Sequence, residues 1–202
     1  GTGAEFLRLT RYEHLEPSQQ SRGVPQPPLE LPPAAGARLL ALPGPATLQV
    51  PACDLRVAIE ARRSRRRFSA SPLSLEELSF LLWCTQGVQQ VLPGATLRTV
   101  PSAGARHALE TYLSVHRVQG LSPGLYRFCA LEHALEPLPS PATPEATAAA
   151  CLDQGFVARS AVTFAWAAVR ARMCWRYGQR AYRYIYLDAG HACQNLYLAA
   201  EA

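Results

Sequence analysis

The stretch EARRSRRRFSASPLSLEEL, residues 60–78, decides how the rest of the chain is interpreted, because it joins two helical patterns through a run of arginines. Five arginines lie between Arg62 and Arg67, interrupted only by Ser64, and Phe68 follows directly. Such a run fits three functions: a nucleic-acid patch, a solvated face, or a cradle for one small anion. The residues on either side help to decide among them.

Helical patterns flank this arginine segment, residues 62–67, on both sides. Before it, Asp54 can cap a helix within residues 53–64. After it, Ser74 and Glu77 have the spacing of a capping box at the start of a second helix. Apolar residues recur at helical spacing in both segments and predict core-facing stripes. The predicted core-facing positions are Leu55, Ala58, Ile59, Leu75, Leu78 and Leu82.

The position of the arginine segment favours an anion cradle. It lies between two core-forming helices, and no second basic stripe with interleaved aromatic residues continues it into a nucleic-acid groove. A phosphate monoester carries close to two negative charges and three acceptor oxygens, which suit arginine forks and a serine hydroxyl. The residues whose spacing allows convergence on one phosphate across a bend are Arg62, Arg63, Ser64 and Arg66.

Composition excludes several chemistries. The 202 residues are 49% hydrophobic and 17% charged, which predicts a folded domain. All 20 basic residues are arginine, so neither a lysine Schiff base nor a Walker A lysine is available. The six cysteines lack metal-ligand spacing, and we expect no metal site.

The same chain shows no sign of export or membrane insertion. No apolar run approaches the ~20 residues that span a bilayer. No basic, apolar and small-residue leader precedes the domain. We therefore expect a cytoplasmic protein with no membrane partner. Because the arginine segment favours a small anion, we also expect no nucleic-acid partner.

Two regions of different composition follow one another. Residues 1–50 are predicted to form a proline-rich arm that lies extended across the surface, since residues 17–36 alone hold six prolines. Residues 51–202 are predicted to form an α+β domain, with helices first, strands in the middle and a long helix last. The run 161–169 predicts a central buried strand, and the alternation over 110–118 a half-buried one. Further strands are expected over residues 123–128 and 133–138, a short helix after Thr143, and the closing helix over residues 176–202.

Three motifs in order resemble the FMN-dependent nitroreductase family. RRSRRRFSASPLSLEELSFLLW, residues 62–83, is similar to the opening signature of that family. VPSAGARHALETYLSV, residues 100–115, and WRYGQRAYRYIYLDAGHACQNLYLAA, residues 175–200, resemble motifs of its SagB-type subgroup, which includes azoline dehydrogenases. The resemblance implies a layered fold with a mainly antiparallel central sheet flanked by helices, in an intertwined homodimer with flavin at the subunit interface. It covers residues 55–202.

The resemblance also assigns site residues. The first motif implies that Arg62, Arg63, Ser64 and Arg66 hold the FMN phosphate and ribityl chain. The second implies that the loop of Pro101, Ser102, Ala103 and Gly104 lies along the flavin ring, where small residues allow close backbone approach. The last motif adds Gln194 as a flavin contact, with Asn195 beside it; either residue could instead support the dimer.

The implied activity is hydride transfer through the flavin N5, to or from a small organic or peptide-derived substrate, with NAD(P)H as an electron donor to consider. Azoline dehydrogenases of the subgroup use a Lys-Tyr pair, and the aligned residues here are Arg176 and Tyr177. Arginine, with a pKa above about 12, is a poor proton acceptor, so Tyr177 is the better candidate for proton transfer. The family pattern also continues beyond the last helix, so the C-terminal end is expected to be truncated.

Two alternatives remain open at this stage. One is a catalytically degenerate member that acts as a binding or scaffold subunit. The other is a basic nucleic-acid-binding protein. Asp188 and His191, three residues apart, are interpreted as a local hydrogen-bonding pair in preference to metal ligands, and His107 either lines the pocket or is a structural histidine.

Overall fold

Local capping signals start three helices of the computed structural model, which describes residues 1–202. Asp54 caps α2 (Leu55–Ala61) by accepting bonds from two backbone N–H groups of its first turn. Ser74 and Glu77 form the reciprocal capping box of α3 (Leu75–Gln86). The hydroxyl of Thr143 caps α4 (Pro144–Ala150). The predictions of these three helix starts are confirmed.

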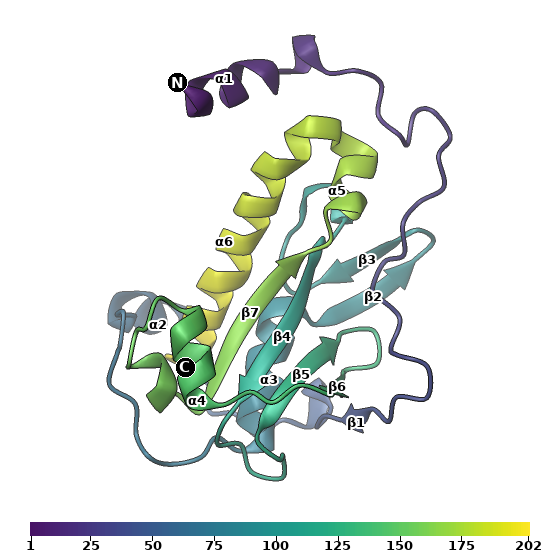
Figure 1. The fold of residues 1–202 in the computed structure, drawn as a ribbon. Coiled ribbons are helices and arrows are strands. Elements are labelled where there is room, and N and C mark those ends of the chain that lie inside the picture. Colours follow the sequence, from purple (N-terminus) through teal and green to yellow (C-terminus); the bar gives the residue numbers. More distant parts are fainter.

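The main sheet has five antiparallel strands in the order β1-β6-β5-β4-β7 (Figure 1). A separate hairpin turns through Gly94, whose φ of 71° suits glycine. This hairpin was not predicted. The strands are β1 (Leu40–Ala41), β2 (Val88–Leu92), β3 (Ala95–Arg98), β4 (Leu109–Val115), β5 (Gly124–Cys129), β6 (Ala134–Leu138) and β7 (Val162–Ala168).

The two faces of the main sheet differ in chemistry. One face is apolar and packs against α3, whose Leu78 and Leu82 are fully buried. The opposite face carries Glu110, Arg127 and Glu136, which come from three neighbouring strands and are also buried. Side chains alternate along a strand, so these charged residues all lie on the face away from α3.

The charges on this second face form a balanced network. Arg127 Nε donates to Glu136 at 2.8 Å, and its Nη1 lies 3.4 Å from Glu110. Glu110 also pairs with Arg172 of α5 (Arg170–Tyr177). Two guanidinium groups and two carboxylates therefore neutralise one another out of water, as buried charges require.

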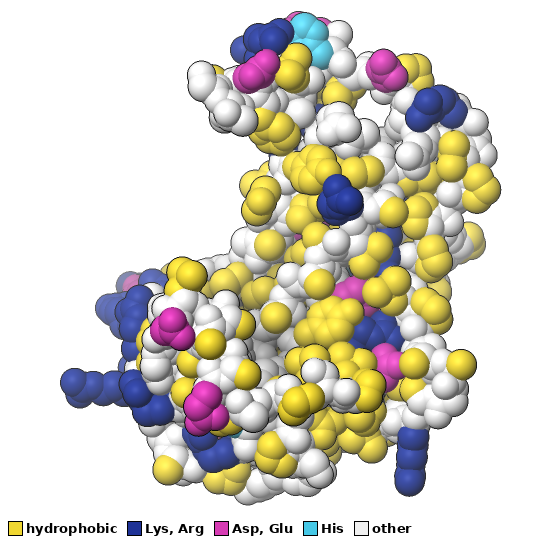
Figure 2. Space-filling view, viewed as in Figure 1, with side chains coloured by type: hydrophobic (Ala, Val, Ile, Leu, Met, Phe, Trp, Pro, Cys, Tyr) yellow, Lys and Arg dark blue, Asp and Glu magenta, His cyan; other side chains and the backbone are white.

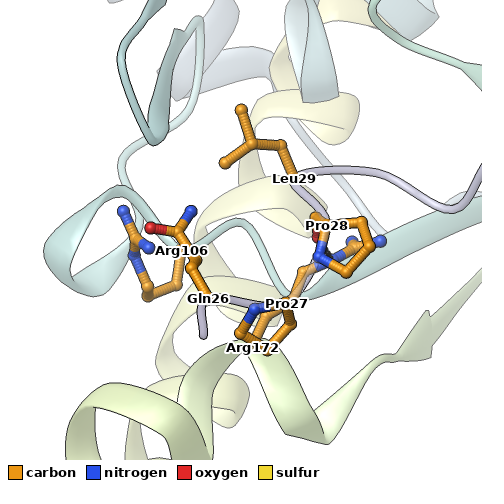
Figure 3. Close-up of a pocket in the computed structure, with 6 residues that line it drawn as sticks. All are labelled: Gln26, Pro27, Pro28, Leu29, Arg106 and Arg172. Atoms are coloured by element: carbon orange, nitrogen blue, oxygen red, sulfur yellow. Dashed lines mark hydrogen bonds between the residues drawn. The ribbon is translucent and has the colours of Figure 1, made fainter. Parts of the chain in front are cut away.

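The N-terminal arm, residues 1–50, covers this network. The backbone N–H of Leu31 donates to Glu110 at 3.0 Å, and that of Ala34 donates to Glu136 at 2.7 Å. Arg172 Nε donates to the carbonyl of Pro28 at 2.8 Å, and its side chain lies against the arm in Figure 3. The arm is thus held by its backbone, which suits a segment whose prolines lack N–H donors.

Two helices at the C-terminal end pack against the start of β4. The buried residues at this junction are Ala108, Leu109, Met173, Ala181 and Ile185. The predicted single helix over residues 176–202 is wrong, because α5 begins earlier and Gly178, with φ 52° and ψ −135°, breaks the pattern before α6 (Ala181–Ala199).

Short 3-10 turns are η1 (Tyr12–His14), η2 (Pro45–Thr47), η3 (Ala103–Ala105), η4 (Val157–Arg159) and η5 (Gly178–Arg180).

Two strand predictions need correction. β7 was expected in the centre of the sheet, but it is an edge strand and its Ala165 and Ala167 are exposed. β4 was expected to be half-buried, but it is central and covered on both faces. The apolar run over residues 161–169 did not predict coverage, since no residue of β7 is buried. The alternation over residues 110–118 did not reveal that Glu110 of β4 is buried within the ion network.

Apolar residues are exposed on α2, α6 and the arm. Only Ala58 of α2 is buried, while Leu55 and Ile59 are 64% and 52% exposed, so the predicted core face of this helix is wrong. On α6, Tyr186 is 79% exposed. Helix α1 (Thr2–Leu9) buries no residue and stands apart from the sheet (Figure 1). No helix of the structure combines the length and apolar character needed to cross a membrane.

Candidate functional site

The loop of residues 101–107 connects β3 to β4 and is fixed to α6 by a buried carboxylate. Ser102 Oγ donates to Asp188 Oδ2 at 2.5 Å, and the Ala103 N–H donates to Asp188 Oδ1 at 3.3 Å. The same hydroxyl accepts a bond from the backbone N–H of His107 at 2.9 Å. One serine thus links the helix to both ends of the loop, and the predicted Asp188–His191 pair is replaced by an Asp188–Ser102 bond.

Three residues of this loop have left-handed backbone conformations. Gly104 has φ 59°, Ala105 has φ 54° and His107 has φ 42°. Only glycine adopts this region freely, so the two other residues store conformational strain. Such strain persists where the surroundings fix the backbone, and it is common at functional sites.

The residues predicted as the acid–base pair lie directly against this loop. A Cβ atom built on Gly104 would lie 2.7 Å from the hydroxyl of Tyr177 and 2.8 Å from Cδ and Nε of Arg176. A residue larger than glycine would therefore clash at position 104, because two side chains of α5 approach its backbone closely. The structure brings together Ser102, Ala103 and Gly104 of the predicted loop with both predicted catalytic residues, and Pro101 is exposed beside them.

The other side of Tyr177 is supported by aromatic and cationic residues. Its ring centre lies 4.6 Å from that of Tyr184, whose hydroxyl accepts a bond from Arg180 Nε at 2.8 Å. The Tyr184 hydroxyl also lies 3.1 Å from that of Tyr12 in the arm. Partial burial would raise the pKa of Tyr184, but its bonds with Tyr12 and Arg180 and the nearby guanidinium charges lower it overall.

Arg106, a residue of the loop itself, ties the loop to the hairpin. Its Nε donates to the carbonyl of Gly104 at 2.8 Å, and its Nη2 donates to that of Gly94 at 2.9 Å. The Gly94 carbonyl also accepts a bond from Gln26 of the arm at 2.8 Å, and Figure 3 shows Gln26 next to Arg106. Burial, and then the positive charge of Arg176, lower the pKa of Arg106.

His107 is a structural histidine in this arrangement. Its ring is buried, and Nε2 lies 3.1 Å from the carbonyl of Thr96. Burial lowers the pKa of His107 to about 3, and the nearby Arg98 charge adds to this effect. The imidazole is therefore neutral at pH 7, which fits its position among three buried or partly buried arginines.

The arginine segment lies elsewhere, at the C-terminal end of α6. The Arg62 guanidinium lies 5.8 Å from the ring centre of Tyr197, and Arg65 pairs with Glu201 at 2.5 Å. Figure 2 shows arginine side chains gathered on the lobe that carries α2 and α4. The spare hydrogen-bond donors of this segment, together with Ser64, suit a phosphate group.

In the structure these guanidinium groups have separate contacts. Arg63 Nη1 donates to the carbonyls of Glu60 and Arg62, and Arg66 Nη1 donates to that of Ser64. The Arg66 guanidinium lies 5.7 Å from the ring centre of Phe156. The four predicted phosphate ligands are thus neighbours on the surface, and their convergence on one anion stays a prediction.

The last predicted ligand, Gln194, is exposed on α6. Its neighbour Asn195 faces inward, where Nδ2 donates to the carbonyls of Cys84 at 3.0 Å and Thr99 at 3.4 Å. Asn195 therefore ties α6 to the end of α3 and to the strand that leads into the loop.

A largely apolar cavity of about 320 Å³ lies between α2, α3 and α6. Its lining includes Trp83, Cys84 and Leu198. Sequence reasoning missed this cavity, as it missed the contribution of Arg106. No three His, Cys, Asp or Glu side chains gather closely enough to hold a metal ion.

Comparison with known proteins defines the class. A crystal structure of a protein from Ralstonia eutropha, provisionally named a nitroreductase, superposes with a TM-score of 0.65 at 28% identity, covering 88% of this chain and 79% of that one. One from Anabaena variabilis with the same provisional name superposes with a TM-score of 0.61 at 28% identity. That match covers 73% of this chain but only 30% of the Anabaena chain. The α+β fold with a central antiparallel sheet is confirmed.

The sequence pattern of the Nitroreductase family matches residues 59–202. A protein of Methanocaldococcus jannaschii with the same provisional name is 37% identical over 139 residues, which are 69% of each chain. This chain therefore belongs to the nitroreductase family, a family of oxidoreductases.

Proposed function

We propose that this protein is an FMN-dependent oxidoreductase of the SagB-type subgroup, located in the cytoplasm. The observation that carries the proposal is the approach of Arg176 and Tyr177 to Gly104, since motifs more than seventy residues apart meet at one loop. In this proposal FMN supplies hydride transfer at N5 when bound. A small organic or peptide-derived molecule is the substrate, and NAD(P)H is the electron donor to be tested first.

The residues of this chain have separate roles in the proposal. The loop of Pro101, Ser102, Ala103 and Gly104 provides a backbone platform for the flavin ring. The hydroxyl of Tyr177 donates a proton near that ring, while Arg176 contributes fixed positive charge, because a guanidinium does not release its proton near neutral pH. Arg62, Arg63, Ser64 and Arg66 hold the phosphate, and Gln194 contacts the flavin from α6.

The proposed unit is a homodimer with a composite site. The loop is anchored at Asp188 and the arginine segment contacts Tyr197, nine positions further along α6, which corresponds to about 14 Å at 1.5 Å per residue. We infer that one copy supplies the arginine segment and the other supplies the loop. The exposed apolar residues of α2 and α6 support this proposal, because a partner would cover them.

Titration of FMN into the purified protein tests the phosphate assignment. The double substitution Arg63→Ala with Arg66→Ala is expected to weaken FMN binding at least about tenfold, since charge-assisted bonds to phosphate are strong. Arg8→Ala with Arg22→Ala removes the same charge from exposed positions of the arm and serves as the control. Equal FMN affinity in the two double variants would reject the assignment.

A binding or scaffold subunit is the second candidate, and Arg176 in place of the subgroup lysine favours it. Such a protein would bind no added FMN and would show no turnover of NAD(P)H. A Tyr177→Phe variant sharpens the distinction: the enzyme hypothesis expects a lower kcat with unchanged FMN affinity, while a scaffold has no turnover to lose.

A further inference from the structure

We propose that Asp188 is a positioning residue that holds the loop of residues 101–107 in the geometry used for the flavin ring. This inference rests on the proposed function and extends it to a residue outside the FMN-binding set. It starts from a carboxylate that is buried in α6, although burial of a charge is costly without a compensating partner.

The contacts of Asp188 are directed at the loop alone. Both oxygens accept bonds from consecutive loop residues, Ser102 and Ala103, and no arginine pairs with the carboxylate. Burial raises the pKa of Asp188, while the bond from Ser102 opposes this rise. Apart from the nearby His191, no cationic group offsets this buried charge, so Asp188 depends on its bonds with the loop for compensation.

The bond reaches further through the Ser102 hydroxyl. That hydroxyl donates to Asp188 and accepts from the N–H of His107, so the carboxylate fixes the direction of its proton. Between these two bonds lie the left-handed residues Gly104 and Ala105. The pair of hydrogen bonds therefore closes the loop around its strained residues and offsets part of their conformational cost.

The fixed loop in turn places Gly104 beside the proposed catalytic group. The backbone of Gly104 lies against the Tyr177 hydroxyl, and a shift of the loop would change that approach. Asp188 thus acts on the reaction through Ser102 and the loop, without touching the reacting atoms itself.

Three substitutions test this role. Asp188→Ala removes both acceptors, and Ser102→Ala removes the hydroxyl. Asp188→Asn keeps the shape and can retain both contacts with its amide turned, accepting from Ala103 and donating to Ser102. Asp153→Asn, at an exposed turn with φ 54°, is the matched control because asparagine tolerates that conformation.

The first measurement is amide hydrogen exchange across residues 102–107 in the FMN-free protein. We expect faster exchange in Asp188→Ala and Ser102→Ala, with partial rescue in Asp188→Asn and no change in Asp153→Asn. The double variant of Asp188 and Ser102 is expected to exchange faster than either single variant, but by less than the sum of their effects, because the two substitutions share the loss of one bond while each also removes a bond of its own, to Ala103 or from His107.

The second measurement is the dissociation constant for FMN. It is expected to rise about tenfold or more in Asp188→Ala and about threefold in Asp188→Asn, since hydrogen bonds to a charged group are about twice as strong as neutral ones. The third measurement is the kcat at saturating FMN, which corrects for weaker FMN binding. The kcat of Asp188→Ala is expected to fall under these conditions, because the Tyr177 hydroxyl and the flavin ring are then misaligned.

If Asp188→Ala changes neither the amide hydrogen exchange of residues 102–107 nor the affinity for FMN, the inference is overturned. Altered exchange with normal FMN affinity and kcat would also overturn it, since Asp188 would then support only the fold. If the wild-type protein binds no FMN, the proposed function fails, while the exchange measurement still decides whether Asp188 holds the loop.

Discussion

The loop of residues 101–107 and the arginine segment of residues 62–67 differ in how their geometry is fixed. The loop is held by buried groups: Asp188 of α6, its own Arg106, which donates to the Gly94 carbonyl of the hairpin at 2.9 Å, and Arg172, which donates to the His107 carbonyl at 3.2 Å. The arginine segment is exposed, and its one ion pair is between Arg65 and Glu201, close to the end of the chain. In a site built from these two regions, the loop would be preformed, whereas the arginine side chains would take up their binding geometry only with a ligand or a partner.

The largest expected effect comes from the ion network behind the loop. Glu110→Ala leaves Arg172 buried without its carboxylate, and we expect the free energy of unfolding to fall by about 3–5 kcal/mol. Urea denaturation at pH 7 measures this loss. Glu201→Ala removes the surface pair with Arg65, whose side chain is 60% exposed, and is the control, for which a loss of at most about 1 kcal/mol is expected. Equal effects of the two substitutions would remove the contrast between the two regions.

A smaller effect is expected at the left-handed glycine. Gly104→Ala places a methyl group at φ 59° and 2.7 Å from the Tyr177 hydroxyl. The backbone strain alone costs about 1–2 kcal/mol. Thermal unfolding should show a lowered Tm, and FMN affinity should fall as Tyr177 is displaced. Gly120→Ala, also at positive φ but with open space around it, separates the strain from the clash; if the two variants behave alike, the close approach to Tyr177 has no consequence.

The smallest expected effect is a pH dependence from His107. Its pKa of about 3 in the folded state lies below the ordinary 6.5, so the unfolded chain binds the proton more readily. Stability from this residue is therefore present above pH 6.5 and is lost as the pH falls toward 3. Between pH 7 and pH 5 we expect a loss of about 1–2 kcal/mol.

His107→Asn tests this assignment, because asparagine tolerates the left-handed backbone but does not titrate. The difference in unfolding free energy between pH 7 and pH 5 should shrink in the variant. An unchanged difference would place the acid sensitivity at other groups.

Sequence patterns predicted best what depends on neighbouring residues. The caps at Asp54, Ser74 and Thr143 involve side chains within three residues of the N–H groups they accept from, so the sequence alone was sufficient. The core leucines of α3 followed from helical spacing in the same way. One prediction failed where distant segments decide, since the edge position of β7 depends on the order in which the strands pair. Another failed because apolar spacing does not report the backbone conformation of Gly178, which breaks the helix.

The candidate site follows the same division. Family resemblance assigned the loop and the pair Arg176 and Tyr177, and the fold brings them together. The bond between Ser102 and Asp188 joins residues 86 apart, and the pairing of Arg172 with Glu110 spans 62 residues. Neither has a local signature, since a lone Asp on a helix is most often a solvated residue. Such contacts become visible only when the topology is known.

The covering of the charged face of the sheet by the N-terminal arm has a practical consequence for how this protein is produced. The family pattern begins at residue 59, yet backbone groups of Leu31 and Ala34 satisfy two buried carboxylates. A recombinant fragment trimmed to the family boundary would expose those acids and the paired guanidinium groups to solvent. The shortest fragment expected to express as a folded, soluble protein therefore begins no later than Pro28.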